Sequence, residues 1–193
     1  VLLKPLRDNP FEAKEFLYAK SLIQSRKERR VEDPRAVHIE GREGLTFTSV
    51  VPIEEDGKEK LIYYTSLAFL DDLKTEYRIG PVDVEKSKNG HIYQAVDGSI
   101  IVVTREDETH KIQFYRFGNI DEALWFMKAG LIKKRWKNKK VLELGLPERF
   151  TVQKGGFYTQ IGFNGVVYNN NSQAILAVLH FARYVEGENN KYY

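Results

Sequence analysis

The residues with the clearest chemical potential in this sequence form a dense cationic run in its second half. Residues 133–140 hold six Lys or Arg side chains and one Trp. Cations at this density neutralise phosphates of a nucleic acid, and an indole among them stacks on a base or sugar. The alternative interpretation is a solvated linker whose charge only keeps the protein soluble. The run predicts nucleic-acid contacts by Lys133, Lys134, Arg135, Trp136, Lys137, Lys139 and Lys140.

Charge is distributed unevenly along the chain. The formal net charge is only +3. Residues 131–154, however, hold 8 Lys or Arg against 2 Asp or Glu, which gives +6, while residues 37–130 hold 11 against 17, which gives −6. A concentrated positive segment of this kind indicates a polyanionic partner. A more dilute basic cluster at residues 26–30 adds Arg29 and Arg30 to the predicted contacts, although a solvated helix end also explains it.

The composition argues against several kinds of catalytic site. The chain holds no Cys, which removes disulfides, Cys-ligated zinc and thiol catalysis. Its four His residues are far apart in sequence, and it contains no phosphate-binding glycine loop and no G-x-S-x-G motif. Its acidic clusters fall mostly in predicted turns, where such residues are common for conformational reasons. We therefore expect no metal, no cofactor and no catalytic residue, with an enzyme assembled only in three dimensions as a third hypothesis.

Neither a membrane span nor a secretory signal is recognisable. The chain contains no run of about 18 apolar residues. Its first residues lack a long apolar stretch that ends at a small-residue cleavage site. We expect a cytoplasmic protein without a membrane partner.

The elements that position these residues follow a plan that occurs three times. Turn signals and apolar spacing predict strand–turn–strand–turn–strand–helix units of roughly 40 residues. The expected fold class is α+β, with an N-terminal helix followed by three small antiparallel β-β-β-α units, consistent with an internal triplication; the alternative is one mixed domain. The predicted segments are an N-terminal helical segment 1–36, units at 37–80, 88–130 and 149–187, and a basic connector at 131–148.

Local signals place the turns and helices of these units. Asp56-Gly57, Asp97-Gly98 and Asn164-Gly165 are each typical of a tight hairpin turn between two strands. Asn119, with Glu122 three residues later, predicts a capped helix with Ile120, Leu124, Met127 and Leu131 on its apolar face. Ser66 and Ser172 predict the starts of the other two helices, at residues 66–73 and from 172 to Gly187.

Strand alternation then assigns residues to an outer sheet face. A small sheet covered by one helix keeps its other face open, and successive side chains point to opposite faces. Polar side chains on an open face can hydrogen-bond to base edges or phosphates, although an ordinary solvated face has the same composition. The outward residues predicted in this way are Lys111, Gln113 and Tyr115 in the second unit, and Tyr158 and Gln160 in the third.

Residues 150–174, FTVQKGGFYTQIGFNGVVYNNNSQA, resemble an AP2-type DNA-binding domain, a module also found in phage homing-endonuclease and integrase-arm proteins. The resemblance implies three strands followed by a helix, with the sheet laid into the major groove. It also implies contacts from the outward strand positions, which here are Lys154, Tyr158, Gln160, Tyr168 and Asn170. The family's binding strands usually carry several Arg or Lys residues, whereas residues 157–170 carry none.

Two functions of different classes follow from these observations. The leading hypothesis is a non-catalytic nucleic-acid-binding protein, with DNA rather than RNA as partner, that uses the basic connector and the outward sheet faces. The alternative is a phage-like inhibitor or adaptor that binds a host protein through its acidic region, residues 37–130. Acidic turns of that region, such as the one at residues 106–108, are expected to mimic phosphates or to dock on a basic partner.

Overall fold

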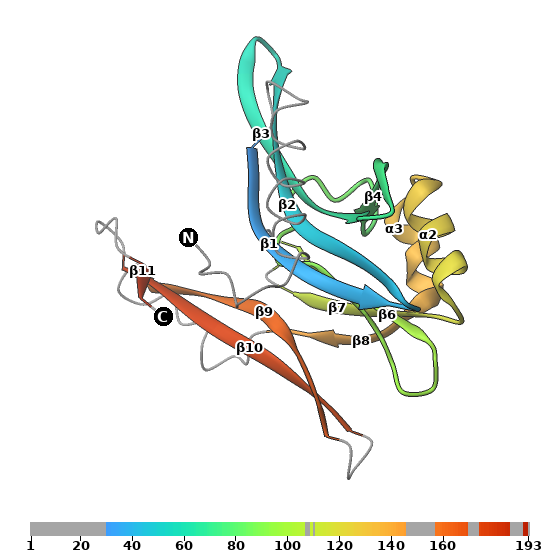
Figure 1. Ribbon diagram of the computed structural model, residues 1–193. Helices are drawn as coiled ribbons and strands as arrows, with labels where there is room; N and C mark the ends of the chain where they lie inside the picture. Colours follow the sequence, from blue (N-terminus) through green and yellow to red (C-terminus); the bar gives the residue numbers. More distant parts are fainter. Residues whose placement is uncertain are drawn as a thin grey trace, which may run out of the picture.

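Three antiparallel sheets and two short helices make up the described part of the molecule (Figure 1). A computed structural model describes residues 30–106, 109, 111–145, 157–169, 174–185 and 191–192. Of the side chains in residues 157–192 it describes only that of Leu179, and those of Arg30, Leu73 and Lys74 are also left undescribed.

The first sheet is a four-stranded meander. Its strands are β1 (Arg30–Ile39), β2 (Arg42–Glu55), β3 (Lys58–Phe69) and β4 (Asp72–Ile79), in that spatial order. Asp56 and Gly57 join β2 to β3 with positive φ angles of 53° and 70°. Two consecutive positive φ angles match the strand twist of a tight hairpin, and Asp-Gly adopts them readily. This predicted turn is confirmed.

The second sheet has the order β5-β6-β7-β8 and carries the helices between its last two strands. The strands are β5 (His91–Gln94), β6 (Ile100–Arg105), β7 (Ile112–Phe117) and β8 (Lys140–Leu144). Between β7 and β8 lie α2 (Ile120–Lys128), α3 (Lys133–Trp136) and the 3-10 turn η1 (Lys137–Lys139). The basic connector is therefore built into this sheet, because it supplies α3, η1 and the edge strand β8.

The third sheet consists of β9 (Phe157–Asn169), β10 (Ala174–Val185) and the two-residue β11 (Lys191–Tyr192). The long strands β9 and β10 pair antiparallel, with Phe157 opposite Val185 and Asn169 opposite Ala174. The register shifts between Val178, which lies opposite Gly165, and Leu179, which lies opposite Phe163, so that Asn164 has no partner on β10. Asn164 is therefore the extra residue of a bulge inside β9, and the predicted hairpin turn at Asn164-Gly165 is wrong.

The main hydrophobic core lies between the first two sheets and the helices. Val37, Ile39, Leu67, Phe69 and Ile79 enter it from the first sheet. The second sheet and the helices contribute Ile92, Ile100, Val102, Tyr115, Phe117, Ile120, Ala123, Leu124, Met127 and Trp136. These side chains belong to one continuous cluster, so the predicted first and second units share a core.

The opposite face of the second sheet is also covered. Tyr93, Ile101, Val103, Ile112 and Phe114 form a second buried cluster there, and Leu179 of β10 packs against it. Figure 1 shows the β9–β10 pair lying along this side of β7 and β8. The second sheet is therefore the middle of three layers, with apolar contacts on both faces.

The expected α+β class with three β-β-β-α units is wrong. Residues 66–73, predicted as a helix, form the end of β3, a turn and the start of β4, while residues 174–185 of the third predicted helix form β10. In both places apolar residues at helical spacing belong to strands, and a nearly continuous apolar run does not distinguish the two structures. Residues 30–36 of the predicted N-terminal helix lie in β1, and residues 1–29 lie outside the described residues.

The predicted helix of the second unit is confirmed as α2. The Asn119 side chain accepts a hydrogen bond from the Glu122 backbone N–H (2.9 Å), and Glu122 Oε2 accepts one from the Gly118 N–H (2.7 Å). Ile120, Leu124 and Met127 are buried in the core, as their spacing predicts. Over the described ranges, no helix has the length and apolar character needed to cross a membrane.

Candidate nucleic-acid interface

Trp136 fixes the basic segment to the core. Its side chain is 0% exposed, and it is the only buried residue of α3 and η1. Its ring makes edge-to-face contacts with Tyr115, Phe117 and Phe126 at centroid distances of 5.0, 5.6 and 5.8 Å. The prediction that this indole stacks on a nucleic-acid base is wrong, because the ring is enclosed by protein.

The inward tryptophan leaves the neighbouring cations on the outside of α3 and η1. Lys133, Lys134, Arg135 and Lys137 are all exposed. The Lys133 backbone N–H donates to Asp83 Oδ1 (2.7 Å), which ties the start of α3 to the loop after the first sheet. The Lys133–Asp83 hydrogen bond and the ring contacts of Trp136 thus hold the backbone of the segment in place, and its charged side chains project outward from it.

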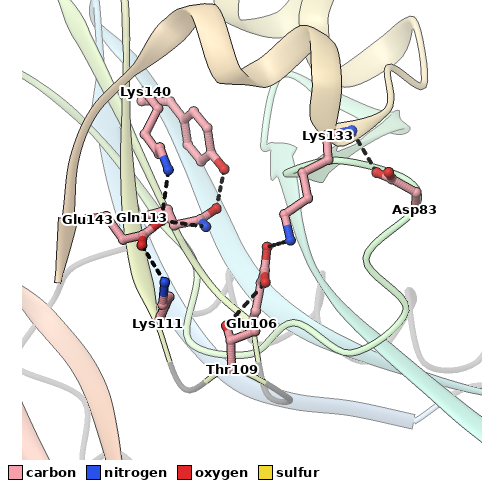
Figure 2. Close-up of polar contacts among 9 residues, drawn as sticks. Asp83, Glu106, Thr109, Lys111, Gln113, Lys133, Lys140 and Glu143 are labelled. Atoms are coloured by element: carbon pink, nitrogen blue, oxygen red, sulfur yellow. Dashed lines mark hydrogen bonds and ion pairs between the residues drawn. The ribbon is translucent and has the colours of Figure 1, made fainter. Parts of the chain in front are cut away.

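Three cations of the segment are neutralised by carboxylates. Lys133 Nζ lies 2.7 Å from Glu106 Oε1, and the Glu106 side chain is only 7% exposed. Lys139 Nζ is paired with Glu122 at the start of α2. Lys140 Nζ lies 2.8 Å from Glu143 Oε2. Figure 2 shows Lys133 reaching Glu106, and Lys140 reaching Glu143 beside the strand.

The other three cations keep their charge available. Lys134, Arg135 and Lys137 form no ion pair with any residue of the described ranges and are exposed. Because Trp136 is inward, these three side chains flank it along α3 and the first residue of η1. They are the part of the predicted basic site that can meet phosphates.

Glu143 in β8 forms ion pairs with Lys140 of this segment and with Lys111 of the neighbouring chain region. It accepts from Lys111 Nζ (2.7 Å), Lys140 Nζ (2.8 Å) and Gln113 Nε2 (3.2 Å). The hydrogen bonds from Lys111 and then Lys140 lower the pKa of Glu143 to about 2. Lys111 is exposed as predicted from the alternation, but its ammonium is already paired (Figure 2).

Gln113 and Tyr115 are buried, so their predicted place on an outer face is wrong. The Tyr115 hydroxyl donates to Gln113 Oε1, and burial raises the pKa of Tyr115. The physical reason is that the second sheet has no open face: one side packs on the first sheet and the helices, and the other packs on Leu179. These two polar groups satisfy each other inside the core.

The predicted residues of the other segments are placed only in part. Tyr158 and Gln160 lie in β9, opposite Tyr184 and Ala182, and Tyr168 lies opposite Ile175. Arg30 begins β1, opposite Val50. The helix that the AP2-type resemblance implies after these strands is β10 instead. Three predicted residues lie outside the described ranges: Arg29, Lys154 and Asn170.

The exposed indole of the described residues is Trp125, which the sequence reasoning missed. Its side chain is 61% exposed, and its ring contacts that of Phe126 at a centroid distance of 5.4 Å. Phe126 in turn contacts Trp136, so an aromatic row leads from the core to the surface of α2. A signal was present, because Trp125 lies off the apolar stripe formed by Ile120, Leu124 and Met127.

A hollow beside η1 was also not foreseen. It has a volume of about 430 Å³. Its lining combines charged, polar and apolar groups from the β5–β6 turn, the end of β7 and the basic segment: Asp97, Ser99, Arg116, Phe117, Gly118, Asn138, Lys139 and Val141. These elements meet there because β8 returns alongside β7 directly after η1.

Some acidic residues of the region 37–130 are held by cations, whereas others, among them Glu54 and Asp121, are exposed. Glu106, in the turn expected to contact a partner, is buried and paired with Lys133. Asp71 accepts two hydrogen bonds from Arg42, each at 2.8 Å. Within the described part of the chain, no three His, Asp or Glu side chains are grouped so as to hold a metal ion.

Comparisons of the chain with protein-family models, with curated proteins and with solved structures find no match.

Proposed function

We propose that the protein binds nucleic acid without catalysis, through the phosphate backbone, using Lys134, Arg135 and Lys137. The observation that supports this most directly is the inward anchoring of Trp136 beside exposed cations that have no carboxylate partner in the described structure. The function rests on these three side chains and not on all six cations of the run.

Anchoring favours binding in a specific physical way. A cation on a disordered linker loses conformational freedom when it contacts a phosphate, and that loss opposes binding. The α3–η1 backbone is already held by the Trp136 ring contacts and by the Lys133–Asp83 hydrogen bond. Only the side chains of the three free cations remain to be ordered.

The ion pairs set the expected strength of the salt dependence. Lys133, Lys139 and Lys140 each have a carboxylate partner, so little net charge is gained when they approach a phosphate. Three phosphate contacts on a duplex correspond to a slope of log K against log salt of about −2.7. Affinity should therefore fall about 40-fold between about 50 and 200 mM salt, far less than six contacts would produce.

The test is a fluorescence-anisotropy titration of labelled duplex DNA, single-stranded DNA and RNA at several salt concentrations. The test variant is Lys134→Gln/Arg135→Gln/Lys137→Gln. The matched control, Lys58→Gln/Lys86→Gln/Lys88→Gln, removes the same charge from the first sheet and the loop that follows it. We expect the test variant to lose binding and its salt slope, and the control to keep both.

Two results contradict the proposal. One is the absence of binding to all three nucleic acids by the wild-type protein at about 50 mM salt, where electrostatic binding is strong. The other is an equal loss of affinity in the test and control variants, because that outcome assigns binding to the overall charge.

A further inference from the structure

The hollow next to η1 has the composition of a binding site for an uncharged polar group. Its volume of about 430 Å³ lies within the range of small-molecule sites. Asn138 and Lys139 line it and directly follow Lys137, the last of the three free cations. The hollow therefore lies beside the backbone that carries the proposed strand-binding cations.

One wall of the hollow is a preorganised polar network. Asp97 Oδ1 accepts from the Ser99 hydroxyl (2.6 Å) and the Ser99 N–H (3.0 Å), and the Arg116 guanidinium is paired with Asp97. Arg116 Nε also donates to Ser99 Oγ (3.1 Å). These bonds hold a carboxylate and a guanidinium side by side, so the wall presents acceptors and donors together.

The opposite charges on the walls argue against a phosphate as the occupant. Arg116 is balanced by Asp97, and Lys139 by Glu122. A phosphate would gain no excess positive charge there and would meet the Asp97 carboxylate in the lining. A neutral group that has both donors and acceptors avoids this repulsion.

The remaining lining supplies an unpaired amide and an apolar surface. Asn138 is exposed, and its side chain has no hydrogen-bond partner among the described residues. Val141 is 59% exposed, and the buried Phe117 also lines the hollow. A planar ring with polar edges and apolar faces is complementary to this combination.

We propose that this hollow binds one unpaired nucleobase of a strand held by Lys134, Arg135 and Lys137, so that the protein prefers single-stranded over duplex nucleic acid. The part of this inference that concerns the strand rests on the proposed function. The binding of a base in the hollow does not depend on it. Bases in a duplex are stacked and paired, whereas a single strand can turn a base outward into a site of this kind.

Free nucleosides test the hollow without any phosphate. The ¹H–¹⁵N spectrum of the whole protein is recorded with adenosine, guanosine, cytidine and uridine, and with ribose 5-phosphate as a probe that lacks the base. We expect a nucleoside to shift the Asn138 side-chain amide and the Gly118 amide, and ribose 5-phosphate to leave both in place. No shift with any nucleoside, or the same shifts with ribose 5-phosphate, would overturn the proposal.

Variants then connect the hollow to strand binding. Asn138→Ala and Val141→Ala should each weaken the binding of a short single-stranded oligonucleotide by up to about tenfold, the size expected for one lost base contact, while leaving duplex affinity unchanged. Leu61→Ala, at an apolar position on the first sheet that is 45% exposed, should have no such effect. Equal losses for single strand and duplex would contradict the base contact.

The experiments distinguish a failure of the proposed strand binding from a failure of the proposed base site. If oligonucleotides bind and depend on the three cations but nucleosides produce no shift, the hollow is not a base site and the proposed function stands. If nucleosides shift Asn138 and Gly118 but no oligonucleotide binds at low salt, the hollow binds a base and the proposed strand binding is wrong. DNA and RNA oligonucleotides of equal sequence show which sugar is preferred.

Discussion

Replacing the two tryptophans one at a time measures how the basic segment is held. Trp136→Ala removes a side chain that is fully buried and contacts three aromatic rings at 5.0–5.8 Å. Truncation of a buried Trp or Phe costs about 3–5 kcal/mol, because apolar contacts are lost and a cavity remains. In a protein of this length 1 kcal/mol lowers Tm by roughly 2–4 °C, so we expect Tm to fall by roughly 6–20 °C.

Trp125→Ala is the matched control. The same indole is removed from a position that is 61% exposed. Surface substitutions usually change the free energy of unfolding by within about 0.5 kcal/mol. Urea unfolding of the wild-type protein and both variants gives the free energies, followed by far-UV circular dichroism because each variant lacks one of the two fluorophores.

Nucleic-acid affinity of the same variants shows which result refutes the reasoning. A surface indole that stacks on a base contributes to binding and not to folding, so its removal leaves stability unchanged. If Trp136→Ala is as stable as the wild-type protein and binds single strands more weakly, Trp136 is a contact residue and the anchoring argument is wrong. If both variants are equally destabilised, the described burial of the two indoles is wrong.

Two further substitutions examine the charge pairing and the sheet packing. The pKa of Glu143 is lowered from 4.5 to about 2, so its ion pairs stabilise the fold above the unfolded-state pKa, and this contribution is lost as the pH falls toward about 2. The difference in Tm between the wild-type protein and Glu143→Gln should therefore shrink between pH 4.5 and about 2. A difference in Tm that stays constant over this interval would contradict the pairing. Gly90→Ala places a Cβ 2.7 Å from Thr65 Oγ1, and this overpacking should lower the free energy of unfolding in urea by about 1–3 kcal/mol. The control Gly145→Ala, whose Cβ has no atom within 4 Å, should have little effect. Equal stabilities of the two variants would argue against this packing.

Local signals in the sequence predicted the elements whose structure is decided locally. The Asn119–Glu122 cap and the turns at Asp56-Gly57 and Asp97-Gly98 depend on side-chain hydrogen bonds and backbone angles within a few residues. All three are present in the structure. The exposed cations Lys134, Arg135 and Lys137 were likewise identified from the sequence, because charge of that density is almost always at the surface.

Local sequence signals did not distinguish a helix from a strand where the segment is buried on both sides. Residues 66–73 contain apolar side chains at helical spacing, yet Leu67 and Phe69 point into the main core from β3, while Ala68 packs on the other face. Residues 174–185 are a similar apolar run and pair along their whole length with β9. In both cases long-range strand pairing decides the structure, and the spacing of apolar residues within one segment does not show which strands will pair.

The wrong placement of Gln113 and Tyr115 has one physical origin, the middle position of the second sheet. Gln113 and Tyr115 were assigned to an open face because each strand was considered alone, but openness is a property of the whole layer. The neighbouring strand β6 contains the run Ile100–Val103, which is buried throughout. Such a continuous β-branched run is typical of a strand covered on both faces.

The same position explains where a binding surface can lie in this fold. The second sheet is covered by the first sheet on one side and by β10 on the other, so its inner strands β6 and β7 expose few side chains. Between β7 and β8 the chain forms α2, α3 and η1, and Figure 1 shows α2 and α3 at one end of the sheets. Trp125, the three unpaired cations and the hollow at Asn138 all belong to this part of the chain or border it. Nucleic-acid binding should therefore depend on substitutions there and be insensitive to those on the exposed residues of the first sheet.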